Sequence, residues 1–152
     1  LRTSVSEAAS IIDQYQRSYP AVAKWLAMQV ERAREEGFVE TLLGRRRYVP
    51  DIRASNRVVR GAAERIAVNM PIQGTQADMI KIAMINIHRA LAEGGFDAQM
   101  VLQVHDELVL EMPPEEEAAV ASLLRAGMID ALPLEVPVEV DLSTGSNWLE
   151  AH

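Results

Sequence analysis

The tripeptide His105-Asp106-Glu107 carries the residue types in this chain that are best suited to chemistry. Two apolar runs rich in β-forming residues flank it, so we expect a hairpin or sharp turn with these groups at its tip. In a straight strand Asp106 would point away from its neighbours, whereas a turn can bring all three together. Desolvating a carboxylate between apolar runs is costly, and a hard divalent cation offsets that cost. The tripeptide therefore predicts a carboxylate ligand for Mg²⁺, with a solvated hairpin tip as the alternative.

A second group of polar residues, Arg65, Asn69 and Gln73, recurs at every fourth position. This spacing places all three on one helical face, provided that the helix bends only mildly at Pro71. Their hydrogen-bond donors suit the base-edge and sugar acceptors of a nucleic-acid minor groove. The alternative interpretation is the polar outer face of an amphipathic helix.

Charge is distributed unevenly along the chain, which has 152 residues and a formal net charge of −7. Residues 41–66 contain seven arginines and two acidic residues, a local charge of +5, whereas the remainder carries −12. Because phosphate binding depends on the local field, this stripe, which includes Arg45, Arg46 and Arg47, predicts a contact with nucleic acid. A solvated face held by salt bridges is the alternative.

The composition excludes several classes of protein. With 49% hydrophobic and 24% charged residues, the chain is neither disordered nor a coiled coil or collagenous repeat. It has no cysteine, which excludes a disulfide framework, a thiolate zinc site and a catalytic thiol. No apolar run reaches the roughly 18 residues of a membrane helix, and no secretory signal pattern opens the chain. We expect a cytoplasmic protein without a membrane partner, and the first residue, Leu1, indicates a piece of a longer chain.

Apolar residues at helical spacing predict about five helices. These helices begin at a capping box of Ser4 and Glu7, at Pro20, near Val58, at Thr75 with Asp78 as a fresh cap, and at Pro113. Gly37 and Gly94 are expected to end the second and the fourth. Pro71 is expected to bend or break the chain between the third and the fourth. The fourth, Ala77–Leu91, is apolar on nearly every side, as in the middle of a core.

Short extended stretches predict antiparallel pairing. Phe38–Leu43 and Tyr48–Pro50 flank Gly44 and the arginines, which indicates a hairpin with a basic tip. Apolar and polar residues alternate over Leu134–Leu142, so we expect a half-buried strand, at a sheet edge because Pro137 cannot donate to a ladder. The predicted fold is one α+β unit with a small antiparallel sheet.

Several segments together resemble one protein family. Gln103–Glu111, the sequence QVHDELVLE, resembles the motif C hairpin of family A DNA polymerases, the class of bacterial DNA polymerase I. Gly37–Ile52 resembles the family's segment after the fingers, Ala63–Asp78 its primer-template-contacting helix, and Gly145–Trp148 its C-terminal end. The resemblance runs in the family's order over essentially the whole chain. It implies a palm-type sheet carrying motif C, with residues 1–36 as a helical part of the fingers and 37–152 as palm and adjoining fingers segments.

The resemblance implies roles for the site residues. Asp106 would be one of two palm aspartates that hold catalytic Mg²⁺ ions, Glu107 an accessory carboxylate ligand, and His105 a neighbour of the primer 3′ end. The remaining residues would contact primer-template DNA: Arg65 and Gln73 in the minor groove, Asn69 in support of them, and Arg45, Arg46 and Arg47 in a hairpin close to the nucleic acid. The implied reaction is attack of the primer 3′-hydroxyl on the α-phosphate of a deoxynucleoside triphosphate (dNTP), with two Mg²⁺ ions at the site.

The family's motif A, with the other metal-binding aspartate, and the fingers helix that meets the dNTP precede everything in this sequence. Since Mg²⁺ in phosphoryl transfer takes more than one carboxylate together with substrate oxygens, Asp106 alone does not complete a site. We therefore expect these residues to be inactive alone and to act with the missing N-terminal part of the polymerase. The alternatives are a non-catalytic nucleic-acid-binding or scaffolding module and a stand-alone metal-dependent hydrolase built on the His105-Asp106-Glu107 tripeptide.

Overall fold

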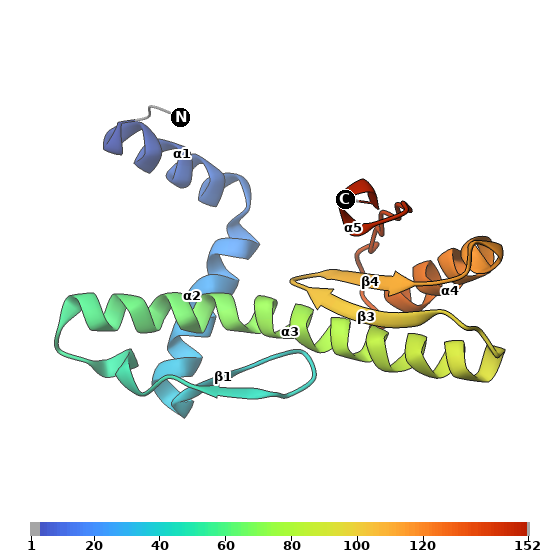
Figure 1. The fold of residues 1–152 in the computed structure, drawn as a ribbon. Helices are drawn as coiled ribbons and strands as arrows, with labels where there is room; N and C mark the ends of the chain where they lie inside the picture. The colour runs from blue at the N-terminus through green and yellow to red at the C-terminus, as the bar shows by residue number, and fades with distance from the viewer. Residues whose placement is uncertain (1–3, 152) are drawn as a thin grey trace. The chain divides into compact units, whose positions relative to one another are not determined.

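The computed structural model describes residues 4–151, in which five α-helices and two two-stranded antiparallel sheets make an α+β fold (Figure 1). The chain packs into two compact units that divide between Thr75 and Gln76, where the sequence predicted one. We call them the N-terminal and the C-terminal unit. None of the described helices is both long enough and apolar enough to cross a membrane.

Two helices open the N-terminal unit. Helix α1 spans Val5–Ser18 behind the predicted capping box, in which the Ser4 amide donates to the Glu7 carboxylate at 2.8 Å and the Glu7 amide donates to the Ser4 hydroxyl at 3.3 Å. Helix α2, Pro20–Glu36, starts with its proline in the first turn and ends at Gly37, whose φ of 79° is the left-handed conformation that glycine allows.

A hairpin follows, in which strand β1 (Phe38–Glu40) pairs with strand β2 (Arg46–Tyr48). The predicted hairpin is confirmed, although its strands are shorter than expected because the chain already turns at Thr41. A short 3₁₀ helix, Pro50–Arg53, then leads to the long helix α3. The core of the unit consists of residues from α2, β1, the 3₁₀ helix and α3, together with Val49 just after β2: Ala33, Val39, Val49, Ile52, Ala63, Ala67 and Met70.

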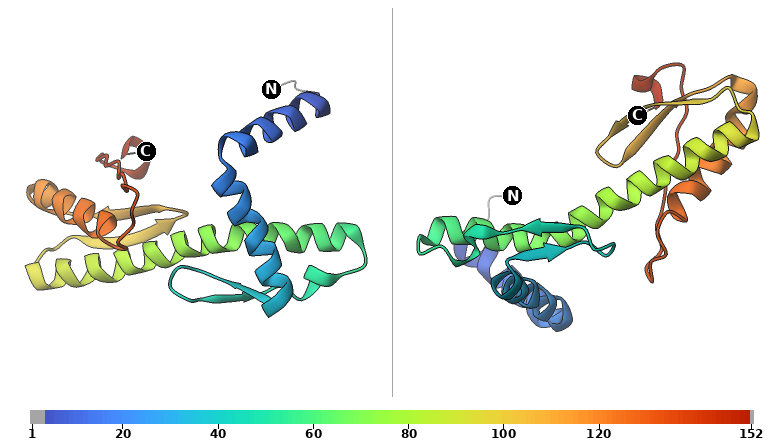
Figure 2. Two further views of the ribbon diagram at one scale, coloured as in Figure 1. Left: turned by 180° about the vertical axis from the view of Figure 1, so that it is seen from behind. Right: turned by 90° about the horizontal axis from the view of Figure 1, so that it is seen from below.

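Helix α3 runs without interruption from Arg57 to Gly94 (Figure 2). Of the bend or break expected at Pro71, the break is therefore wrong, and so is the fresh cap at Thr75. A proline in a helix interior leaves one carbonyl without its amide donor, but buried side chains of the same helix lie on either side of it and hold the helical path. The Thr75 hydroxyl does not cap a new helix: it donates back to the Pro71 carbonyl at 2.5 Å.

The C-terminal unit contains the second hairpin and two further helices. Strand β3, Gln99–Val104, pairs with strand β4, Glu107–Glu111. A 3₁₀ turn at Pro114–Glu116 then leads into helix α4, Glu117–Ile129, and a short helix α5, Trp148–Ala151, lies near the C-terminus. The core of this unit is formed by Ala83, Ile87, Leu91, Ala98, Val120, Leu124 and Ala131.

The second half of α3 buries one stripe rather than its whole surface. Ala83, Ile87 and Leu91 are buried, whereas the Ile85 residue between them is 57% exposed. The expectation of a helix surrounded by core is therefore wrong for this chain. On the buried side α4 approaches closely, because a Cβ at Gly127 would lie only 2.6 Å from Cγ1 of Ile87.

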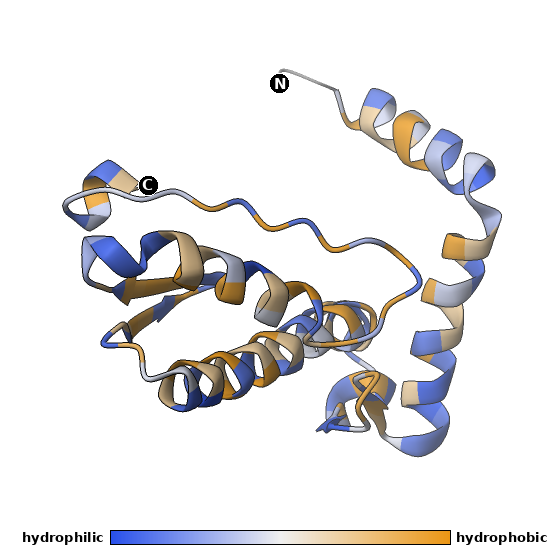
Figure 3. Cartoon of the chain, turned by 90° about the vertical axis from the view of Figure 1, so that its right-hand side faces the viewer, coloured by the Kyte–Doolittle hydropathy of each residue, from blue (hydrophilic) through white to orange (hydrophobic). Residues whose placement is uncertain are grey.

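The strand predicted at Leu134–Leu142 is absent. Figure 3 shows an extended run before α5 whose hydropathy colours alternate, yet among residues 4–151 the strands β3 and β4 pair only with each other. Val138, Val140 and Leu142 are half-buried, and the acidic residues between them are exposed. The predicted half-burial holds for these three residues but fails at Val136, which is 66% exposed. A strand also needs a partner for its backbone groups, and the described residues supply none to this run.

Candidate functional site

The β3–β4 hairpin places His105 and Asp106 in a two-residue turn. Val104 and Glu107 form the last cross-strand pair before it, and all three residues of the tripeptide are exposed. His105 has a φ of 52°, a left-handed conformation that is uncommon for residues other than glycine. The side-chain amide of Gln103 donates to the His105 carbonyl and supports that conformation. The prediction of a hairpin with ionisable groups at its tip is confirmed.

A β-bulge in β3 lies on the way to this turn. Met100 pairs with Leu110 and Leu102 pairs with Val109, so Val101 is one extra residue in the ladder. A bulge bends its strand, increases the local twist and re-aims the side chains that follow. The simple alternation assumed from the sequence therefore does not set the direction of the hairpin tip, and no sequence signal marked the bulge.

The donor set at the tip fits a part of a magnesium site. Carboxylate oxygens are the ligands that Mg²⁺ prefers, and proteins commonly hold this ion through one or two carboxylates while substrate phosphates and waters complete its shell. Asp106 and Glu107 are adjacent and exposed on a paired hairpin. In residues 4–151, however, no three His, Cys, Asp or Glu side chains come together as a metal-binding group. Further ligands would have to come from outside these residues.

Within the C-terminal unit, a concave surface begins at the hairpin tip. It has a volume of 1070 Å³ and is lined by β4, by α4 and by the run from Glu139 to Trp148. Its apolar lining includes Leu108, Leu110 and Leu124. An open surface with apolar walls beside two carboxylates is suited to holding a further segment of protein.

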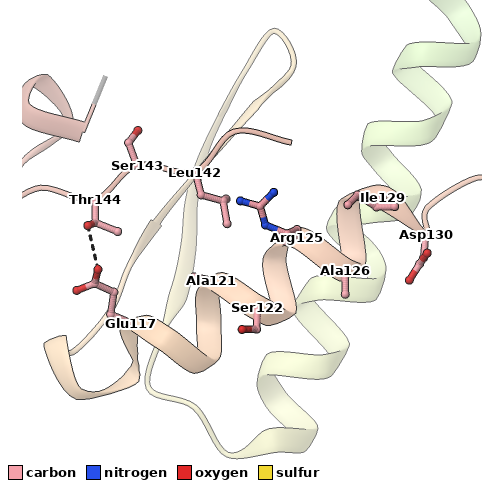
Figure 4. Close-up of a pocket in the computed structure, with 10 residues that line it drawn as sticks. All are labelled: Glu117, Ala121, Ser122, Arg125, Ala126, Ile129, Asp130, Leu142, Ser143 and Thr144. Carbon is pink, nitrogen blue, oxygen red and sulfur yellow. Dashed lines mark hydrogen bonds between the residues drawn. The ribbon is translucent and has the colours of Figure 1, made fainter. Parts of the chain in front are cut away.

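Two hydrogen bonds hold the extended run against α4. Figure 4 shows the first, in which the Thr144 hydroxyl donates to the Glu117 carboxylate at 3.0 Å. In the second, the Arg125 guanidinium donates to the Val140 carbonyl at 2.8 Å. Side-chain hydrogen bonds thus hold the extended run against α4 beside the concave surface. The run needs no strand pairing to stay there.

Arg65, Asn69 and Gln73 lie on one exposed face of α3. The helix is continuous through Pro71, so all three residues belong to one helix. The opposite face is buried in the core of the N-terminal unit. Exposure on one face fits both the nucleic-acid interpretation and the solvated alternative, so the binding role stays a prediction.

The three arginines of the first hairpin have different surroundings. Arg46 donates to the Glu40 carboxylate at 2.8 Å, and its guanidinium lies 4.4 Å from the centre of the Phe38 ring. The Arg45 guanidinium donates to the Gly74 carbonyl at 2.9 Å. Arg47 is exposed on β2. Arg46 thus matches the salt-bridge alternative.

Glu40 is shared by two guanidinium groups. Besides Arg46 it accepts a hydrogen bond from Arg32 of α2 at 2.5 Å. The hydrogen bond from Arg46, followed by that from Arg32, lowers the pKa of Glu40 below its usual 4.5. The Glu40 carboxylate ties the base of the hairpin to α2 and neutralises part of the local positive charge.

Sequence reasoning missed a polar junction between the first hairpin and α3. Thr41 and Thr75 are only 5% and 8% exposed. The Leu42 amide donates to the Thr75 hydroxyl at 3.0 Å, and the Arg45 amide donates to the Thr41 hydroxyl at 3.1 Å. The available signal was the threonine four residues after Pro71, a spacing at which a hydroxyl reaches back to the proline carbonyl.

Sequence reasoning also missed the role of Glu116. Its two carboxylate oxygens accept from the backbone amides of Asp97 and Ala98 at 2.9 and 3.0 Å. These amides come directly before β3, so one side chain from the start of α4 fixes the base of the second hairpin. Glu116 stands in a row of three glutamates, residues 115–117, whose local signal is a favourable charge at a helix start and not a contact with a distant strand.

Comparisons with known proteins cover nearly the whole chain. Residues 1–150 match the sequence profile described as DNA polymerase family A. The thermostable DNA polymerase I of Thermus aquaticus is 51% identical over 145 residues, which are 95% of this chain and 17% of that protein. The DNA polymerase I of Mycobacterium tuberculosis is 48% identical over 148 residues, which are 97% of this chain and 16% of that protein.

A solved polymerase structure also matches this chain. The POL domain of Pol1 from M. smegmatis, in complex with DNA primer-template and dNTP, has a TM-score of 0.94 and 44% sequence identity to this chain. The match covers 99% of this chain and 26% of that one. The chain spans 16–17% of the length of the two curated relatives named above.

Proposed function

Because this chain belongs to DNA polymerase family A, we propose that it supplies one part of a site for template-directed DNA synthesis. The observation that carries the proposal is the β3–β4 turn, which exposes Asp106 and Glu107 at the tip of a paired hairpin inside the matched region. The described residues hold no complete metal-binding group, which favours a partial site over a self-sufficient one.

The proposed reaction joins a dNTP to a primer. The primer 3′-hydroxyl loses its proton and attacks the α-phosphate, a new P–O bond forms, and the bond to the leaving pyrophosphate breaks. The solved relative was captured with primer-template and dNTP, which supports these two substrates for the polymerase to which this chain contributes. Mg²⁺ ions, when bound, would neutralise the negative charge on the attacking and leaving oxygens.

The hairpin tip holds the carboxylate side of this site. In the proposal Asp106 is a direct Mg²⁺ ligand, Glu107 is an accessory carboxylate beside it, and His105 lies near the primer 3′ end. The tight two-residue turn and the Gln103 contact keep these groups in a fixed order on a rigid support. A ligand that is already in place loses little conformational freedom when the substrates arrive.

The exposed face of α3 reads the duplex. Purine N3 and pyrimidine O2 atoms occupy similar positions in the minor groove of every correct base pair, so donors there test pair shape without reading sequence. Arg65 and Gln73 supply such donors, and Asn69 between them supports the contact. The local charge of +5 around this face and the hairpin, including exposed Arg47, attracts the phosphate backbone.

The preceding part of the polymerase completes the site. In this proposal residues 1–36 belong to the fingers and residues 37–152 to the palm and adjoining fingers segments. A segment that precedes the chain covers the concave surface beside β4, pairs with the extended run at 134–142 and brings the second carboxylate. The open apolar lining and the run without a strand partner among the described residues both support an additional strand at this place.

The minor-groove role is tested by Arg65→Ala and Gln73→Ala in the complete polymerase domain, meaning this chain continuous with the segment proposed to precede it. Each loss of a contact is expected to weaken binding of matched primer-template by about 5- to 150-fold, equivalent to about 1–3 kcal/mol. Titration of a labelled primer-template measures the change.

Arg89→Ala is the matched control, because Arg89 is an exposed arginine on the same helix outside the proposed face. It is expected to leave binding nearly unchanged. Unaltered binding in the Arg65 and Gln73 variants would contradict the minor-groove role. An equal loss on matched and mismatched primer ends would contradict the testing of pair shape.

A further inference from the structure

We infer that the loop between β1 and β2 locks α3 at Pro71 and so holds Gln73 in line with Arg65 and Asn69. The inference rests on the function proposed for that face. It gives Thr75, together with Arg45, the role of positioning residues that act on DNA only through the helix.

The lock acts at the weakest point of the helix. Pro71 has no amide hydrogen, so the Ala67 carbonyl one turn earlier receives no helical hydrogen bond from it. A proline inside a helix costs about 3 kcal/mol, which makes this the place where α3 opens most readily. The weak point lies between Asn69 and Gln73, and it therefore separates the last residue of the proposed DNA-reading face from the other two.

A single buried hydroxyl joins the loop to this point. The Thr75 hydroxyl donates to the Pro71 carbonyl at 2.5 Å and accepts from the Leu42 amide at 3.0 Å. The hydroxyl therefore donates one hydrogen bond and accepts another, and the residue is only 8% exposed. Removal of this hydroxyl would leave the Leu42 amide without its acceptor at a partly buried position, where water replaces a lost hydrogen bond only in part.

The loop makes a second attachment one residue earlier. The Arg45 guanidinium donates to the Gly74 carbonyl at 2.9 Å, and the Arg45 amide is held by the Thr41 hydroxyl at 3.1 Å. Close approach is possible because residue 74 has no side chain. A Cβ there would lie 2.7 Å from Cγ2 of Thr41 and 3.2 Å from Cε of Met70.

These contacts surround the peptide units directly after Gln73. Because successive helical residues are about 100° apart around the axis, even a local change of winding at Pro71 turns Gln73 off the face that Arg65 and Asn69 share. The loop opposes that change at two points: the Leu42 amide holds the Thr75 hydroxyl, which in turn binds the Pro71 carbonyl, and the Arg45 guanidinium binds the Gly74 carbonyl. Arg45 and Arg47 are both exposed, and the Arg45 guanidinium is hydrogen-bonded to the helix.

The test compares Thr75→Val with Thr75→Ser in the complete polymerase domain. Valine keeps the shape and removes the hydroxyl, whereas serine keeps the hydroxyl. We expect Thr75→Val to weaken binding of matched primer-template about 5-fold, with kcat at saturating DNA unchanged. Amides near Pro71 should exchange hydrogen faster. Thr75→Ser should restore both properties, and Ser122→Ala, which removes an exposed hydroxyl that donates to the Ala118 carbonyl within α4, should alter neither.

A double variant shows whether the effect passes through Gln73. In a Gln73→Ala background, Thr75→Val should cause no further loss of DNA binding, because the side chain that the lock positions is already absent. An additional 5-fold loss in that background would overturn the inference. Arg45→Gln, a change at an exposed side chain, provides a second variant with the same expectation. A loss that persists without Gln73 would overturn the positioning role of Arg45.

The outcomes separate this inference from the function on which it rests. If Gln73→Ala leaves DNA binding intact, the minor-groove role fails, and the inference falls with it. If Gln73→Ala weakens binding while Thr75→Val changes neither binding nor exchange near Pro71, the minor-groove role stands and the lock alone is overturned.

Discussion

Asp106→Ala in the complete polymerase domain is expected to lower the rate of primer extension about a thousandfold. Asp106 lies in an exposed two-residue turn, so its side chain contributes little to packing and the hairpin should form without it. Its proposed contribution is the carboxylate that helps to hold Mg²⁺ where charge develops on the reacting phosphate. Single-turnover extension of a labelled primer at saturating DNA and dNTP measures the effect, and a DNA titration should show binding within about twofold of the unaltered protein.

Asp97→Ala is the matched control, because Asp97 is an exposed aspartate just before the same hairpin. It should leave extension nearly unchanged. Extension that survives in Asp106→Ala would remove this residue from the metal site and would favour the alternative of a non-catalytic nucleic-acid-binding module. Loss of both extension and DNA binding would indicate instead that the turn residue supports the fold.

Ile87→Ala is expected to lower the free energy of unfolding of the C-terminal unit by about 2–5 kcal/mol. Ile87 is fully buried at the centre of that unit's core. The close approach of α4 at Gly127 leaves the surrounding backbone little room to collapse into the space that alanine would vacate. Urea unfolding of this chain, followed by hydrogen exchange of the β3 and α4 amides, reports on the C-terminal unit separately from the N-terminal one.

Ile85→Ala is the control on the same helix, since Ile85 has the same side chain but is 57% exposed. Its effect should stay within about 0.5 kcal/mol. Equal destabilisation by the two substitutions would contradict a single buried stripe. It would support the original expectation of a helix that is buried on every side.

Features that depend on residues close together in the chain could be predicted from the sequence. The capping box at Ser4, the stop at Gly37 and both hairpins need only a few neighbouring residues, because local hydrogen bonds and backbone preferences decide them. The hairpin with His105 and Asp106 at its tip belongs to this class, which is why the candidate metal ligands could be located from their flanking apolar runs.

Features that depend on distant partners could not be predicted. Pro71 and Thr75 taken alone indicate a helix break and a new cap, but the core packing and the Leu42 contact that keep α3 continuous come from tertiary structure. The alternation before α5 was interpreted as a strand because burial on one side produces the same period whether or not a partner strand is present. The Val101 bulge and the Gly74 approach likewise follow from paired or packed backbones rather than from any local motif.

Primer extension by this chain alone tests the central claim, that it holds only part of a polymerase site. The measurement combines the chain with primer-template, the four dNTPs and Mg²⁺, and runs the complete polymerase domain beside it as the positive control. We expect template-directed extension by the complete domain and none by the chain alone. Template-directed extension by the isolated chain would contradict it, because Asp106 and Glu107 would then suffice without any preceding segment.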